Sequence, residues 1–215
     1  MMKWLVTLAV ALAGSTFLFS EQDKPKDKPA AEKPTGEKAE PPGAADMAKA
    51  MADWMKSMQP GEGHKHLEGF IGKWNTVTKM WMAGPGSPPM ESPGVSEVKW
   101  VLDKRFLMEE HKGQLMGMPY NGMGLMGFDN DRNMYTQCWA SNMGTTLLTM
   151  TGSRSEDGNA FTFYGQMDEP MLKVYGRTVK YQTKIVDADK HVFTIYDLHA
   201  SDDYKVIEMT YTRAK

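Results

Sequence analysis

The clearest arrangement of titratable side chains in the sequence is Glu109-Glu110-His111, within a segment of strand-like character. Side chains alternate between the two faces of a β-strand, so Glu109 and His111 share one face. A carboxylate and an imidazole held together in this way can act in acid–base catalysis. A solvated strand face near a hairpin explains the same residues without chemistry, and we favour that interpretation. We therefore assign no catalytic residue.

The histidines and the cysteine are too few and too scattered to predict a metal site. The chain has five histidines and one cysteine. His64 and His66 could both bind one metal ion only if the segment between them is extended, and no third ligand is visible beside them. One cysteine excludes both a cysteine-based structural zinc site and an intrachain disulfide framework. Haem is an alternative cofactor through His191, which opens a late strand and could point into a barrel.

The methionines raise the question of copper, because the chain has 20 of them and thioethers bind Cu(I). Copper-binding methionine tracts gather several methionines in polar, flexible sequence. Here the methionines are spread from Met47 to Met209, mostly where Leu or Ile would serve. We interpret them as adaptable apolar packing. The group between Met108 and Met126 could in addition form a flexible lip to a pocket.

Motifs and charge exclude several classes of function. The sequence contains no G-x-S-x-G, no P-loop, no dinucleotide glycine fingerprint and no H-E-x-x-H. The stretch 113–127 is rich in glycine but lacks the lysine of a phosphate loop, and bulges at a barrel corner explain its glycines better. The 25 Lys and Arg against 27 Asp and Glu give a net charge of −2, which argues against nucleic-acid binding.

The first 20 residues resemble a secretory signal. Lys3 is followed by an uncharged, mostly apolar run from Trp4 to Phe19. This run has about 16 residues, fewer than the roughly 20 that a transmembrane helix needs. We expect cleavage after Ala13 or after Ser20, no stable membrane span afterwards, and a secreted or periplasmic protein.

Two segments separate this signal from the folded domain. Residues 21–45 hold five prolines and eleven charged residues but no aromatic side chain, which predicts a disordered linker. Residues 46–59 predict a short amphipathic helix that begins at Asp46 as its N-cap and ends at Pro60. One face of this helix is apolar, formed by Met47, Met51, Trp54, Met55 and Met58. The helix lies across the domain, caps an open barrel end, or offers a face to a partner or a membrane.

From Gly72 onward the apolar pattern changes to a period of two, which is typical of β-strands. The clearest alternating runs are 95–102, 160–167, 174–186, 191–198 and 204–213. Turn sequences rich in Asp, Asn and Gly separate them and indicate about ten short strands in antiparallel order. A sheet of that size leaves two vulnerable edges unless it closes. We therefore predict an all-β domain over residues 64–215, a roughly ten-stranded antiparallel up-and-down barrel.

One pair of motifs predicts how the barrel closes. Gly72 and Trp74 form a G-x-W at the start of the first strand, and Arg213 ends the last strand. A guanidinium stacked over this indole would tie the two chain ends together by a cation–π contact. An ordinary core tryptophan and a solvated arginine remain the alternative.

Several longer motifs resemble those of the bacterial family known as domain of unknown function 1579. They read HKHL, GKW, PGSPP, WVLDKRFL, MGMPYNG, GFDN, WASNMGT and a closing YTR. Together they cover about residues 64–215. Lys104 stands where the family usually has Gly, and Phe128 where Tyr is common. The resemblance implies a lipocalin-like barrel and no particular reaction.

A barrel of this kind can enclose a small ligand. Large or soft side chains are expected at its rim and inner face, namely Trp81, Trp100, Met116, Met118, Tyr120 and Trp139. We therefore predict non-covalent binding of a small apolar or amphiphilic molecule. The alternatives are a barrel enzyme, either haem-dependent or using acid–base catalysis, and a structural or adaptor protein of the cell envelope.

Overall fold

The structure is a computed structural model that describes residues 43–169 and 173–215. The expected signal at 1–20 and nearly all of the expected linker at 21–45 lie outside these residues. No helix in the described part of the chain has the length and apolar character needed to cross a membrane.

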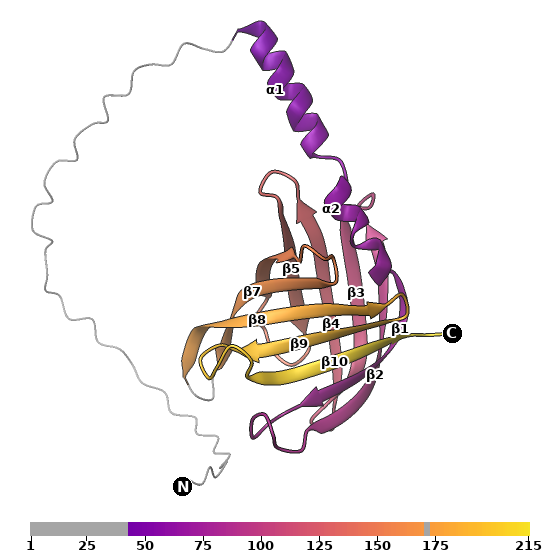
Figure 1. The fold of residues 1–215 in the computed structure, drawn as a ribbon, viewed down its shortest axis with the longest axis vertical. Helices are drawn as coiled ribbons and strands as arrows, with labels where there is room; N and C mark the ends of the chain where they lie inside the picture. Colours follow the sequence, from indigo (N-terminus) through magenta and orange to yellow (C-terminus); the bar gives the residue numbers. More distant parts are fainter. Residues whose placement is uncertain (1–42, 170–172) are drawn as a thin grey trace, which may run out of the picture. The chain divides into compact units, whose positions relative to one another are not determined.

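The described strands form one closed antiparallel barrel, in which each strand pairs with the next and β1 also pairs with β10 (Figure 1). This confirms the predicted ten-stranded up-and-down barrel. The strands are β1 (Gly72–Met80), β2 (Met90–Val101), β3 (Phe106–Leu115), β4 (Met118–Asp129), β5 (Met134–Ser141), β6 (Leu148–Arg154), β7 (Ala160–Glu169), β8 (Val174–Asp187), β9 (Lys190–Asp197) and β10 (Lys205–Arg213).

Alternating burial along the strands explains why the sequence pattern works. On β7, Phe161 and Phe163 are buried, whereas Tyr164 is half exposed on the outer face.

Strand β2 begins five residues earlier than the pattern predicted and includes Pro93. Pro93 pairs only with Val77 on β1, since β3 joins β2 from Gly94 onward. A proline fits there because this stretch of β2 is locally an edge strand.

From residue 43 onward, three short helices precede the barrel: α1 (Ala44–Ser57), α2 (Glu62–Lys65) and the 3-10 helix η1 (Glu68–Phe70). Helix α1 begins two residues before the predicted start, and its N-cap is Gly43 rather than Asp46, which lies in the first turn. It buries none of its residues, so its apolar stripe does not pack on described residues. The side chains of Leu67 and Phe70, in contrast, enter the barrel core.

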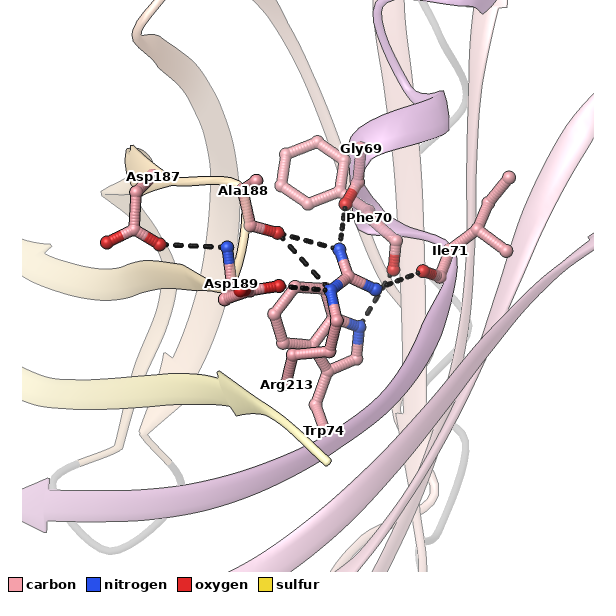
Figure 2. A network of polar contacts seen from close by, with 8 residues as sticks. All are labelled: Gly69, Phe70, Ile71, Trp74, Asp187, Ala188, Asp189 and Arg213. Atoms are coloured by element: carbon pink, nitrogen blue, oxygen red, sulfur yellow. Dashed lines mark hydrogen bonds and ion pairs between the residues drawn. The ribbon is translucent and has the colours of Figure 1, made fainter. Parts of the chain in front are cut away.

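Arg213 joins three parts of the chain at one end of the barrel, which we call the Trp74 end (Figure 2). Its guanidinium carbon lies 4.2 Å from the centre of the Trp74 ring. Its Nη1 donates to the carbonyl of Ile71 at 2.8 Å, and its Nη2 to the carbonyl of Ala188 at 2.8 Å. The last strand is thereby tied both to the segment before β1 and to the β8–β9 turn.

Gly72 leaves the space that this arrangement needs. A Cβ atom at Gly72 would lie 2.7 Å from Arg213 Nη1, and the residue has a φ of 132°, which side-chain-bearing residues rarely adopt. Trp74 is almost fully buried, and its Nε1 donates to the carbonyl of Phe70 at 2.8 Å. The expected closure residues thus lie in one cluster.

Candidate ligand-binding site

The interior of the barrel holds a cavity of about 400 Å³ to which every strand contributes side chains. Near the Trp74 end the interior is filled instead by aromatic rings, including Phe70 and Tyr135, which both pack edge-on against Phe161. The walls of the cavity are mostly apolar. Six of the described lining residues are methionines: Met80, Met126, Met143, Met150, Met167 and Met209.

The indole ring of Trp139 forms one wall of the cavity and packs directly on the backbone of β4. Gly122 and Gly124 point inward on β4, and the Trp139 ring covers both of them. A Cβ atom at Gly124 would lie 2.6 Å from this ring. Trp139 Nε1 donates to the hydroxyl of Tyr120 at 2.8 Å, which fixes both rings. The glycines therefore make room for a side chain.

The glycine-rich stretch 113–127 does not form the bulged corner that the sequence suggested. Strands β3 and β4 pair residue by residue from Phe106 opposite Gly127 to Leu115 opposite Met118, without a shift of register. Gly122 and Gly124 serve inward packing, and Gly117, with a φ of 78°, lies in the turn that joins the two strands.

A buried polar cluster lies in the wall beside this indole. It consists of Ser96, Glu109, His111 and Tyr211, and we call it the Glu109 cluster. The Ser96 hydroxyl donates to Glu109 Oε1 at 2.7 Å, and the Tyr211 hydroxyl donates to the same oxygen at 3.0 Å. Ser96 Oγ also lies 3.0 Å from His111 Nδ1. Ser96 and His111 are each only 3% exposed, and Glu109 keeps part of its surface toward the cavity.

Burial controls protonation in the cluster. It raises the pKa of the Glu109 carboxyl, although the hydrogen bonds from Ser96 and Tyr211 oppose this rise. Burial also lowers the pKa of His111, which favours the neutral imidazole. Because the single Ser96 hydroxyl hydrogen goes to Glu109, His111 Nδ1 must then carry the hydrogen that it shares with Ser96. For Tyr211, burial and then the nearby Glu109 raise the pKa well above its usual value.

His191 lies at the floor of the cavity among aromatic rings. Its imidazole stacks on Tyr211 with 4.3 Å between ring centres, and it meets the edges of Trp74 at 4.5 Å and Phe70 at 5.1 Å. Burial, and then the positive charge of Arg213, lower the pKa of His191 to about 3. These contacts account for the burial of a neutral His191 within the aromatic core.

The family model for "Protein of unknown function (DUF1579)" matches residues 59–213. The chain belongs to the DUF1579 family. The match covers the whole barrel and the α2 and η1 turns before it.

Solved structures that are similar to this DUF1579 protein share little sequence identity with it. Rv2717c from M. tuberculosis matches with a TM-score of 0.52 and 13% identity, over 73% of this chain and 100% of that chain. The S-type phycobiliprotein lyase CPES from Guillardia theta matches with a TM-score of 0.47 and 11% identity, over 73% and 99%. No curated protein matches the chain. The similarity to Rv2717c shows the fold alone.

The six ligand-binding candidates chosen from the sequence occupy four different places in this DUF1579 protein. Tyr120 and Trp139 line the cavity. Trp100 packs against the core beside it. Trp81 lies under the ammonium group of Lys205, 5.4 Å from its nitrogen. The remaining two, Met116 and Met118, lie at the β3–β4 turn and are about half exposed.

Sequence reasoning missed two members of the Glu109 cluster, Ser96 and Tyr211. Ser96 lies on the same face of its strand as Val98, so a polar residue on an apolar face was the available signal. No comparable signal marks Tyr211 in the sequence. Glu109 and His111 were recognised as sharing a face, but the interpretation as a solvated face was wrong, because both point into the barrel.

The remaining histidines near the barrel make separate contacts. His64 Nδ1 accepts from the backbone N–H of Gly61 at 3.0 Å, and His66 Nδ1 lies 2.8 Å from the Tyr135 hydroxyl. Among residues 43–169 and 173–215, no three His, Cys, Asp or Glu side chains gather as a metal site would require.

Proposed function

We propose that this DUF1579 protein binds a small amphiphilic molecule non-covalently inside the barrel. The observation that carries the proposal is the cavity of about 400 Å³, which combines apolar walls with a buried polar cluster at one side. Ligand pockets commonly enclose roughly 300–1,000 Å³ and place a few polar groups in an apolar lining.

The character of the walls supports this proposal. Methionine side chains are flexible and polarisable, so they can repack around ligands of irregular shape. Trp139 and Tyr120 are fixed by their mutual hydrogen bond and offer a rigid aromatic surface in the same cavity as these adaptable side chains. A ligand in the cavity would remove both surfaces from water, which is favourable by roughly 25 cal/mol for each Å² of apolar surface.

A matched pair of tryptophan substitutions tests the proposal. Leu148 lines the cavity, whereas its neighbour Leu147 is 59% exposed. We expect the neutral fluorescent probe N-phenyl-1-naphthylamine to bind the purified protein with a stoichiometry of one. Leu148→Trp should abolish binding by filling the cavity, and Leu147→Trp should not. Circular dichroism would confirm that both variants fold. No binding by the unchanged protein, or equal binding by both variants, would contradict the proposal.

We propose acid–base catalysis on a bound molecule as the second candidate. The favouring observation is that Ser96 bridges Glu109 and His111 through contacts of 2.7 and 3.0 Å, beside the cavity. A carboxylate with a raised pKa is suited to accept a proton near neutral pH. In D₂O, the protein should accelerate α-hydrogen exchange of 2-decanone, followed by NMR, and Glu109→Gln should abolish the effect. Exchange at the buffer rate would rule this candidate out.

We also propose that the chain is exported. The support is the sequence of residues 1–20, with a basic start and an uncharged apolar run. N-terminal sequencing of the mature protein should find a new terminus after Ala13 or after Ser20. An intact Met1 in the mature protein would contradict export by cleavage.

A further inference from the structure

We infer that the ligand is an amphiphile with a protonated amine at one end, which pairs with the carboxylate of Glu109, while its apolar chain fills the rest of the cavity. The inference rests on the proposed ligand-binding function and names the chemical class of the ligand.

The charges around the cavity are the first reason. Among the described residues that line it, Glu109 is the one acidic side chain, and neither lysine nor arginine occurs. The two histidines in the lining, His111 and His191, are held neutral by burial. An ionised Glu109 therefore has no counter-ion in the wall. Burying a carboxylate without a partner is costly in free energy. A ligand with a cationic group offsets this cost, because it pairs with the Glu109 carboxylate.

The hydrogen-bond inventory is the second reason. Both hydroxyl hydrogens near the carboxylate are already used, because Ser96 and Tyr211 donate to Glu109 Oε1. No hydrogen bond within the described residues reaches Oε2. The wall therefore offers the ligand an acceptor and has no hydroxyl hydrogen left to give at this point. When Glu109 is ionised, a donor group therefore fits at Oε2, and a carboxylate or phosphate does not.

The third reason is the aromatic surface next to the carboxylate. The ring of Tyr120 lies 5.7 Å from that of His111, and the charge of Glu109 adds to burial in raising the pKa of Tyr120, as expected for neighbours. An ammonium group is attracted to the face of an aromatic ring as well as to a carboxylate. An alcohol also donates a hydrogen bond, but it lacks the charge that both groups attract.

Three ligands with the same chain and different heads test the inference: dodecylamine, 1-dodecanol and dodecanoate. Each would compete with N-phenyl-1-naphthylamine at pH 7, below the concentration at which it forms micelles. We expect the amine to bind at least about tenfold more tightly than the alcohol, as one well-placed ion pair allows, and dodecanoate to bind most weakly.

Substitutions at the adjacent residues Glu109 and Glu110 provide the matched variants. Glu109→Gln keeps the shape of the side chain and should bring the affinities for amine and alcohol within about threefold of each other. Glu110 lies on the outer face with its side chain half exposed, so Glu110→Gln should leave the preference unchanged. Binding of the neutral probe would show that each variant retains its cavity. Should Glu109→Gln fail to fold, Glu109→Met, which has an uncharged side chain of similar size, should remove the preference in its place.

The outcomes separate this inference from the proposed function. Binding of all three ligands without preference, or tightest binding of dodecanoate, would overturn the inference and leave a ligand-binding barrel. An amine preference that survives Glu109→Gln would overturn the assignment to Glu109. Failure of the probe and of all three ligands to bind would overturn the proposed function itself.

Discussion

The hydroxyl of Tyr211 on β10 donates a 3.0 Å hydrogen bond to Glu109 on β3, although 102 residues separate them in sequence. Two strands, β1 and β2, lie between these partners around the barrel. The residues paired with Tyr211 across those strands are small: Thr76 on β1, and Gly94 opposite Thr76 on β2. A Cβ atom at Gly94 would meet Thr76 Oγ1 at 2.7 Å and the His111 ring at 2.9 Å. The polar cluster therefore depends on small residues in the intervening strands.

The first prediction concerns the stability of the protein without ligand as the pH rises. Burial raises the pKa of Glu109, so the folded protein keeps a proton that the unfolded chain releases. The free energy of unfolding therefore falls as the pH rises above about 4.5, the ordinary value for this group, and through the folded pKa. Glu109→Gln removes this loss.

Urea unfolding between pH 4 and pH 8 measures the effect. The stability of Glu109→Gln relative to the unchanged protein should increase with pH across this range. Glu110→Gln, which changes a half-exposed side chain on the outer face, should show no such trend. A Glu109→Gln difference that stays constant with pH would contradict the prediction.

The second prediction concerns the glycines beneath Trp139. In Gly124→Ala, the new methyl group would lie 2.6 Å from the indole and 2.7 Å from the carbonyl oxygen of Cys138. Overpacking of this kind costs about 1–3 kcal/mol of stability. Displacement of Trp139 should also weaken binding of N-phenyl-1-naphthylamine. Gly144→Ala is the control, because nothing lies within 4 Å of its added Cβ. Equal stability and probe affinity in the two variants would argue against the packing described.

The sequence predicted the features that depend on one strand at a time, but not those that depend on pairing between strands. Alternation along single strands was enough for the barrel, since the predicted run 160–167 lies within β7 and 174–186 lies within β8. Alternation did not show which face of β3 is inside. Glu109, Glu110, His111 and Lys112 are four polar residues in succession, so neither face is visibly apolar. The inner face follows from pairing, which places Glu109 between Val98 and Gly124.

The Glu109 cluster shows the limit of reasoning from local pattern. Ser96 lies 13 residues from Glu109, and Tyr211 lies 102 residues away. Only the closed barrel brings them together, and no periodicity within one strand encodes such a contact. Helix α1 shows another limit: its amphipathic pattern predicted the helix but not where its apolar face lies, and Met51 and Trp54 are each more than half exposed.

The third prediction concerns the Arg213 contacts shown in Figure 2. Arg213→Ala removes the cation–π contact with Trp74 and the charged donors to the carbonyls of Ile71 and Ala188. We expect a loss of about 2–4 kcal/mol in the free energy of unfolding, and a smaller loss for Arg213→Lys. Arg132→Ala is the control, since that side chain is 74% exposed and its ion pair is 3.9 Å long. Similar losses for Arg213→Ala and Arg132→Ala would contradict the proposed closure.

The last prediction concerns acid sensitivity, and it arises from His191. Because its pKa falls to about 3 in the folded protein, His191 stays neutral where the unfolded chain, with an ordinary value of 6.5, already binds a proton. The unfolded state therefore gains protons first, and the free energy of unfolding falls by up to about 1.4 kcal/mol per pH unit as the pH drops below 6.5. Urea unfolding from pH 7 to pH 4 should show a shallower fall for His191→Gln. His199→Gln, at an exposed site, should keep the original slope. An NMR titration that finds the His191 ring protonated by pH 6 would contradict this account.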